Sequence, residues 1–270
     1  MFEPAVYLDG LVVILFAGLL TWLLSLVKRD VGIVDSLWAP MFLFAAIAYW
    51  SNVADPGTRA SIVLALVGLW TLRLTGYITW RNWGEDEDAR YRAIRHRNQP
   101  GFGFKSLYLV FGLQGVIAWI VSLPLLAAIT SDAPLGLLDF IGMGLWLVGM
   151  TFETLGDWQL ARFKGDPANR GKVLDSGLWR YSRHPNYFGN ACIWWGFFLI
   201  ALSAGGWWSL VSPILMTFLL LKVSGVALLE KDIGERRPSY REYIERTNAF
   251  VPGPPKSIEA ADRTRTEAGI

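Results

Sequence analysis

The segment RYSRHPNYFGN, residues 180–190, gathers polar side chains between two long apolar runs. Pro185 fits the first turn of a helix, because proline lacks an N–H that this turn leaves unbonded in any case. The free N–H groups and the positive dipole end there suit a phosphate. Positive charge comes from Arg180, Arg183 and His184, and a ring for stacking comes from Tyr187. Hydrogen-bonding amide groups come from Asn186 and Asn190. We predict a cytoplasm-facing site for an anionic nucleotide cofactor; binding of lipid head groups is the alternative, and composition leaves the two level.

A second group of ionisable residues lies inside apolar segments, where a charge is costly and therefore marks a functional candidate. Residues four apart share a helix face. The group comprises Asp35, Arg73 with Tyr77, Glu153 with Asp157, and Lys222 with Glu230. For Asp35 we favour function over a helix cap. For Lys222 and Glu153, a structural ion pair or a side chain that reaches the membrane interface is an equal alternative.

The elements that carry these residues are predicted to be membrane-spanning helices. The chain is 53% hydrophobic with a mean hydropathy of +0.34, more than a soluble domain of this size buries. Its 14 tryptophans suit membrane interfaces. A spanning helix needs about 20 mostly apolar residues. Seven segments qualify, at roughly 7–27, 31–50, 60–80, 106–130, 135–160, 187–204 and 207–229, so we predict an all-α integral membrane protein of about seven transmembrane helices.

The distribution of basic residues predicts the orientation of these helices. The loops after the first, third and fifth segments hold 2, 6 and 6 Lys and Arg residues, and the tail holds 8, which makes 22 of the 25 in the chain. Cytoplasmic loops carry such an excess. We therefore predict a cytoplasmic C-terminus, an N-terminus outside, and a solvated cytoplasmic loop over 82–104, with His96 on its surface.

Several classes of protein are excluded by what the sequence lacks. The single cysteine, Cys192, and two histidines allow neither an internal disulfide nor a Cys-based or His-rich metal centre. No GxGxxG follows a strand and no GxxxxGK[ST] is present, so no soluble nucleotide-binding module is expected. Nothing indicates a nucleic-acid partner. The first apolar run carries Glu3 and Asp9 where a signal peptide would be basic, and we read it as a retained helix.

Five further stretches join the opening segment in a resemblance that covers roughly residues 30–255. They are VDSLWAP, LWTLRLTGYITWRNWGEDEDARY, FETLGDWQLARFK, NRGKVLDSGLWRYSRHPNYFGN and LLEKDIGERRPSYREYIERTNAFVP. The chain resembles the superfamily of membrane steroid 5α-reductases, sterol reductases and isoprenylcysteine carboxyl methyltransferases. More closely, it resembles the bacterial branch of 5α-reductase-like proteins, the DUF1295 family.

The resemblance implies one membrane domain over 1–255, whose C-terminal half, about 135–252, binds NADPH from the cytoplasmic side. Residues 256–270, Pro-rich at their start and then charged, are expected to be a disordered tail. The implied cofactor contacts are Asp157, Arg162, Lys164, Tyr181, Arg183, His184, Asn186, Tyr187, Asn190 and Glu230. The implied reaction is hydride addition to an activated C=C bond of a lipophilic enone drawn from the bilayer.

Two positions depart from the steroid enzymes, where a glutamate preceded by glutamine and a tyrosine hold the ketone. Asp35, preceded by Val34, stands at the acid position, and Trp70 stands at the tyrosine position. We expect a protonated Asp35 to stabilise the enolate, with Arg73 or Tyr77 as partner. The alternatives are a methyltransferase dependent on S-adenosylmethionine and a non-catalytic protein that binds membrane lipids. A bacterial inner membrane is the expected location.

Overall fold

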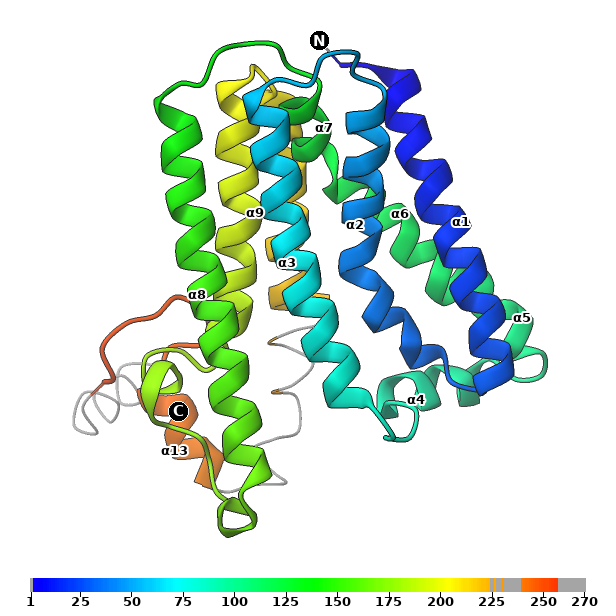
Figure 1. Ribbon diagram of the computed structural model, residues 1–270. Coiled ribbons are helices and arrows are strands. Elements are labelled where there is room, and N and C mark those ends of the chain that lie inside the picture. Colours follow the sequence, from blue (N-terminus) through cyan, green and yellow to red (C-terminus); the bar gives the residue numbers. More distant parts are fainter. Residues whose placement is uncertain (1, 224–225, 227–229, 231–238, 257–270) are drawn as a thin grey trace, which may run out of the picture. The chain divides into compact units, whose positions relative to one another are not determined.

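The computed structural model describes residues 2–223, 226, 230 and 239–256. Every regular element in these ranges is a helix (Figure 1), which confirms the predicted all-α fold. The chain divides into two compact units. Unit 1 comprises Met1–Phe140 and Phe197–Ser212, and unit 2 comprises Ile141–Gly196 and Pro213–Ile270. The predicted single domain with a cofactor-binding C-terminal half stays a prediction, and of the predicted tail only Lys256 is described.

Five helical stretches in the described part of the chain are long and apolar enough to cross a membrane. They are α1 (Pro4–Lys28), η1 with α2 (Val31–Ile33 and Val34–Ser51), α3 (Thr58–Asn82), the stretch Phe102–Val121, and α8 (Leu137–Gly165). The sixth predicted helix coincides with α9 (Pro185–Ser203). The seventh starts within η5 (Trp207–Leu210) and continues through α10 (Val211–Phe218) and η6 (Leu219–Val223). The fold is that of a multi-pass membrane protein, and its orientation stays a prediction.

The predicted helix 106–130 is interrupted. It is built from α5 (Phe102–Ser106), the π-helical η2 (Leu107–Gly112), α6 (Leu113–Val121) and α7 (Leu123–Ile129). Pro124 lies in the first turn of α7 and has no N–H to continue the α6 ladder. The loop predicted over 82–104 contains one further helix, α4 (Ala89–Arg97).

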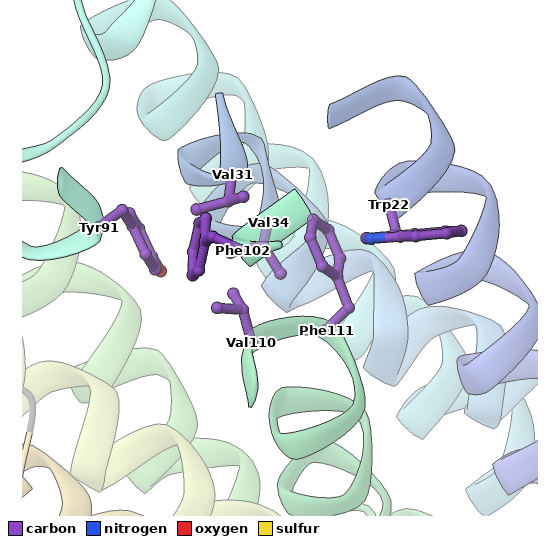
Figure 2. Close-up of a cluster of buried hydrophobic side chains, with 7 residues drawn as sticks. All are labelled: Trp22, Val31, Val34, Tyr91, Phe102, Val110 and Phe111. Carbon is purple, nitrogen blue, oxygen red and sulfur yellow. The ribbon is translucent and has the colours of Figure 1, made fainter. Parts of the chain in front are cut away.

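Unit 1 is built on α1, α2 and α3, which lie side by side with α6 against α1 and α2 (Figure 1). A buried cluster joins this layer to α4 and α5. Figure 2 shows its seven side chains, with Tyr91 at one end and Trp22 at the other. The Trp22 indole N–H donates to the Gly103 carbonyl at 2.9 Å. Tyr91 is the one buried side chain of α4. The cluster therefore fixes the position of α4 through Tyr91.

A closed ionic cluster holds the start of α3 to the start of α8 in the same unit. Arg59 donates to both carboxylate oxygens of Asp139, at 2.8 and 3.0 Å. Its remaining N–H groups reach Ser131 and the carbonyls of Ala133 and Pro134. Asp139 also accepts from the Gly136 N–H and the Ser203 hydroxyl.

Unit 2 is built on the close approach of α8 and α9, whose backbones meet at glycines (Figure 1). A Cβ at Gly149 would lie 2.6 Å from the Gly189 carbonyl oxygen, and one at Gly196 would lie 2.7 Å from the Gly142 carbonyl oxygen. Glycines seven residues apart recur on one helix face, at 142, 149 and 156 and again at 189 and 196. Helices that meet at small residues pack backbone to backbone.

The polar segment between α8 and α9 carries two short 3₁₀ helices, η3 (Pro167–Asn169) and η4 (Gly177–Arg180). Helix α13 (Ser239–Arg246) covers η4, because the buried Tyr243 hydroxyl donates to the Trp179 carbonyl. The Trp179 indole N–H in turn donates to the Gly156 carbonyl of α8 at 3.1 Å. These contacts fix the chain that enters α9.

Candidate functional site

Arg183, two residues before α9, is the centre of a buried cluster in unit 2. Its Nε and Nη2 groups donate to the two carboxylate oxygens of Glu230 at 2.7 and 2.8 Å. Its Nη1 group donates to the carbonyls of Ile244 and Thr247, and its backbone N–H donates to the Asn248 carbonyl. The guanidinium thus ties the entry of α9 to α13 and to Glu230.

His184 adds a second contact to the same carboxylate. Its Nε2 lies 2.8 Å from Glu230 Oε1, and its ring stacks on Tyr187, with centroids 5.5 Å apart and planes 6° apart. The Ser182 hydroxyl accepts from the His184 N–H and donates to the Phe250 carbonyl. The turn before Pro185 is therefore fixed by its own side chains.

Glu230 is ionised across the neutral range. Burial raises the pKa of its carboxyl, but the hydrogen bonds from His184 and Arg183 and the charge of Arg183 outweigh burial and hold this pKa at about 2. The cluster thus combines a cation with a carboxylate that is ionised at neutral pH. Any anionic ligand of Arg183 would meet the Glu230 carboxylate beside it.

Two asparagines of α9 reach two acids of α8 across the glycine contact. The Asn186 amide donates to Asp157 at 2.9 Å, and the Asn190 amide donates to Glu153 at 2.9 Å. Both acids are buried. The Asn186 Oδ1 atom is also buried and has no hydrogen-bond partner among the described residues. A buried acceptor without a partner marks a place where a ligand or a water donates.

The other predicted cofactor residues of unit 2 lie at the surface. Arg162 stacks over the Trp158 ring at 5.6 Å, and Lys164 and Tyr181 are exposed. The structure thus brings together Asp157, Arg183, His184, Asn186, Tyr187, Asn190 and Glu230 within unit 2 and leaves Arg162, Lys164 and Tyr181 exposed. The sequence reasoning missed Ser182 and the carbonyls of Ile244 and Thr247, because a carbonyl partner leaves no signal in residue type.

Asp35 is the centre of a polar group in unit 1. Its carboxylate accepts from the Tyr91 hydroxyl at 2.5 Å and from Arg90 Nη2 at 3.0 Å. Gln114 of α6 donates to the same hydroxyl at 3.2 Å. The structure therefore joins Asp35 to two residues of α4, and these lie in the loop that the sequence analysis assigned to solvent.

Helix α4 is held beside Asp35 by a second ion pair. Glu87 accepts from Arg95 at 2.6 and 2.9 Å and from the Val31 N–H at 2.9 Å. Burial raises the pKa of Glu87, but the hydrogen bonds from Arg95 and Val31 outweigh it and lower this pKa below its usual range. Glu87 was predicted to be solvated, and it instead anchors α4 to the start of α2.

The other two predicted catalytic residues lie further along α3. Arg73 and Arg81 flank the Tyr77 ring, at 5.6 and 5.8 Å from its centroid. Trp70, at the position of the steroid enzymes' tyrosine, is fully buried and meets Phe42 edge to face at 5.6 Å. The described hydrogen-bond partners of Asp35 are Tyr91 and Arg90, and the expected role of Arg73 or Tyr77 beside Asp35 at the enolate stays a prediction.

Comparison with known proteins gives a family and two relatives. A family described as a protein of unknown function, DUF1295, matches residues 21–247. An uncharacterized protein of Schizosaccharomyces pombe is 29% identical, over 91% of this chain and 79% of its own length. A very-long-chain enoyl-CoA reductase of Dictyostelium discoideum is 23% identical, over 55% of this chain and 48% of its own length. No solved structure matches.

These relatives correct one expectation. The sequence analysis placed the resemblance in a bacterial branch, yet both relatives are eukaryotic proteins, so a restriction to bacteria is not supported. The match to the enoyl-CoA reductase spans about half of that protein. The family match spans most of this chain, and the chain therefore belongs to the DUF1295 family.

Proposed function

We propose that the chain is a membrane-embedded reductase that uses NADPH to saturate an activated C=C bond of a lipophilic α,β-unsaturated carbonyl compound. The observation that carries the proposal is the similarity to a very-long-chain enoyl-CoA reductase, whose name describes this reaction class. The gathering of seven predicted cofactor residues in unit 2 supports it. The enone predicted from the sequence and an enoyl thioester present the same conjugated carbonyl to a hydride.

The residues of unit 2 suit a dinucleotide with phosphates at one end and a carboxamide at the other. Arg162 and Lys164 place two positive charges at the exposed end of α8, and such charges suit phosphates. The buried Asn186 Oδ1 lacks a donor, and a nicotinamide carboxamide has N–H groups to offer. When bound, NADPH supplies the hydride. The position of Tyr187 and of the turn before α9 is fixed by the contacts among Arg183, His184 and Glu230.

We propose a different role for Asp35 from the one that the sequence analysis gave it, on the basis of its contacts in unit 1. Hydride addition builds negative charge on the carbonyl oxygen, and that charge requires a donor. Asp35 already accepts from Tyr91 and Arg90, so both described contacts use its carboxyl group as an acceptor and not as a donor. Burial, followed by the Asp35 charge, raises the pKa of Tyr91, so its hydroxyl keeps its proton. We assign the donor role to Tyr91, whose single O–H would turn from Asp35 to the carbonyl oxygen when the substrate binds, and a positioning role to Asp35. Arg73 and Tyr77 remain the proposed partners on α3.

The cofactor is tested by thermal unfolding of the purified protein in detergent with NADPH, NADH or S-adenosylmethionine. We expect NADPH to raise the midpoint most, because a ligand that binds the native state stabilises it by mass action. Stabilisation by S-adenosylmethionine alone would replace the reductase with the methyltransferase. Stabilisation by none of the three, with anionic lipid effective, would support the lipid-binding alternative.

Asn186→Ala tests the site itself. We expect NADPH affinity to fall at least tenfold, about 1.4 kcal/mol, because the variant loses a buried acceptor and a contact to Asp157. Asn169→Ala is the matched control, since the described contact of the Asn169 amide is to the Phe163 carbonyl at the end of α8. Equal affinities of the two variants would remove Asn186 from the site.

Tyr91→Phe separates carbonyl activation from cofactor binding. We expect turnover of long-chain enones and 2-enoyl thioesters to fall about 10²–10³-fold, with the NADPH-induced rise in unfolding midpoint unchanged. Asp35→Asn should lower turnover less, since an amide can still accept from Tyr91. Wild-type turnover of Tyr91→Phe with lowered stability would show that Tyr91 only anchors α4.

A methyltransferase is the second candidate, and one observation favours it. Glu230 places a carboxylate that is ionised at neutral pH in the buried cluster, and the sulfonium of S-adenosylmethionine is a cation that a carboxylate attracts. Glu230→Gln distinguishes the two cofactors. It should weaken binding of S-adenosylmethionine if the methyltransferase is correct, and it should not weaken binding of the NADPH phosphates through electrostatics.

The predicted orientation belongs to the same proposal, because the cytoplasm is the expected source of the cofactor. A reporter that fluoresces only in the cytoplasm, fused after Ile270, tests it. A fluorescent fusion agrees with a cytoplasmic C-terminus. A dark fusion that is expressed at the normal level would reverse the orientation.

A further inference from the structure

A groove lies between α1 and α2 in unit 1. Its volume is about 420 Å³, within the range of small-molecule sites. Its walls are mainly apolar, and they are formed by Asp9, Val12, Val13, Phe44, Ile47, Ala48, Ser51 and Asn52. The groove therefore fits a flexible hydrocarbon chain.

The groove is separate from the polar centre at Asp35. Its α2 residues follow Asp35 by 9 to 17 positions, which corresponds to roughly 14–25 Å along a helix at ~1.5 Å per residue. The groove is also bounded by a rigid contact. A Cβ at Gly10 would lie 2.4 Å from the Tyr49 ring, and Tyr49 is fully buried and bonded to Ser122 at 2.7 Å. The α1–α2 contact beside the groove is thus fixed by packing.

The polar groups of the lining divide into bonded and available ones. Ser51 and Asn52 both donate back to the Ala48 carbonyl, at 2.9 and 2.8 Å, so each side chain already has a partner on α2. Asp9 is exposed, and no partner of its carboxylate is described in the ranges that the structure covers. It is the charged residue of the lining. Asp9 lies in the second turn of α1, near one end of a membrane-length helix, at the depth of the head groups.

An apolar groove with one carboxylate selects the chemistry of its occupant. The walls suit an acyl chain, and the carboxylate suits a cationic head group that can also donate hydrogen bonds. A primary ammonium meets both requirements. A quaternary ammonium has charge but no N–H, and an anionic head group is repelled. We propose that this groove binds one aminophospholipid, whose acyl chain fills the groove and whose ammonium pairs with Asp9.

Native mass spectrometry of the full chain in detergent tests the proposal. The protein is titrated with phosphatidylethanolamine, phosphatidylcholine or phosphatidylglycerol of identical acyl chains. We expect one tightly retained phosphatidylethanolamine, weaker retention of phosphatidylcholine, and the weakest retention of phosphatidylglycerol. Equal retention of all three, or a preference for phosphatidylglycerol, would overturn the proposal.

Two variants separate the head group from the chain. Asp9→Asn should reduce the preference for phosphatidylethanolamine over phosphatidylglycerol by about tenfold, the factor for a charge-assisted hydrogen bond. Ala48→Phe should fill the groove and abolish tight retention of any lipid. Leu72→Phe, at a lipid-exposed position of α3, is the control and should behave as the parent. Unchanged retention in Asp9→Asn or Ala48→Phe would place the lipid elsewhere.

Discussion

Two buried arginines, Arg59 in unit 1 and Arg183 in unit 2, have the same basic arrangement and differ in how completely they are bonded. Each donates through Nε and Nη2 to both oxygens of a carboxylate, at 2.7–3.0 Å. Each also donates to two backbone carbonyls. Such bidentate contacts fix geometry as well as charge.

The difference lies in what each cluster leaves available. All five N–H groups of Arg59 are bonded, and the side chains of Arg59 and Asp139 are 2% and 1% exposed. Arg183 has four of its five N–H groups in described contacts, and the side chains of Arg183 and Glu230 are 9% and 16% exposed. The cluster at Arg59 can only stabilise the fold, whereas the cluster at Arg183 can also contact a ligand.

The largest expected effect comes from breaking the closed cluster. Arg59→Ala leaves Asp139 buried without its cation, and we expect a loss of about 3–5 kcal/mol in the free energy of unfolding. Equilibrium unfolding in detergent measures it, with the exposed Arg170→Ala as control. Removing both charges, in Arg59→Met with Asp139→Leu, should cost less than Arg59→Ala. A loss below about 1 kcal/mol in Arg59→Ala would show that the pair behaves as a surface salt bridge.

An intermediate effect, with a characteristic pH dependence, is expected in the open cluster. The folded state depresses the pKa of Glu230 from 4.5 to about 2, so its contribution is complete above about pH 4.5 and is lost as the pH falls towards 2. Glu230→Gln should be less stable than the parent by about 1.5–3 kcal/mol at neutral pH, and this gap should close on acidification. Unfolding curves between pH 3 and 7 measure the gap, with Glu242→Gln, on the exposed face of α13, as control. A gap that is constant with pH would contradict the ionised Glu230.

The smallest effect is expected at an exposed pair in unit 2. Arg246 bonds Asp175, with side chains 42% and 47% exposed. Exposed pairs contribute about 0.2–1 kcal/mol, so Arg246→Ala should barely change the unfolding curve. A loss of stability as large as that of Arg59→Ala would mean that burial does not explain the difference between the Arg246–Asp175 and Arg59–Asp139 pairs.

The sequence predicted the long apolar helices because burial in lipid requires continuous apolar runs, and such runs are visible without a structure. It did not predict the break before Pro124, because apolar residues continue through it. Helix α4 was missed for the opposite reason. Its sequence, ARYRAIRHR, is mostly charged, and its position depends on Tyr91 reaching a cluster whose members lie far apart in the chain.

The sequence analysis predicted which residues form the candidate site, but it predicted only in part which residues contact one another. The polar residues before α9 do gather, but the pairing of Arg183 with Glu230 spans 47 positions, and no local pattern specifies such a contact. The same holds for Asp35, whose partners Arg90 and Tyr91 lie 55 and 56 positions away. Arg183→Ala is consequently a poor probe of binding alone, since it also removes the cation paired with the half-buried Glu230 and leaves that carboxylate its contact to His184.

The glycine contact between α8 and α9 determines how tolerant the asparagine–acid pairs are to change. The three atoms nearest to a Cβ at Gly189 are backbone atoms of Glu153 and Gly149, and backbone atoms cannot move aside as a flexible side chain can. A Cβ at Gly189 would lie 2.5 Å from the Glu153 backbone nitrogen, so one added methyl group would act as a spacer and separate Asn186 and Asn190 from their acids together. The spacing of the two helices is therefore itself a determinant of the site, and a residue that touches no ligand can set the affinity for one.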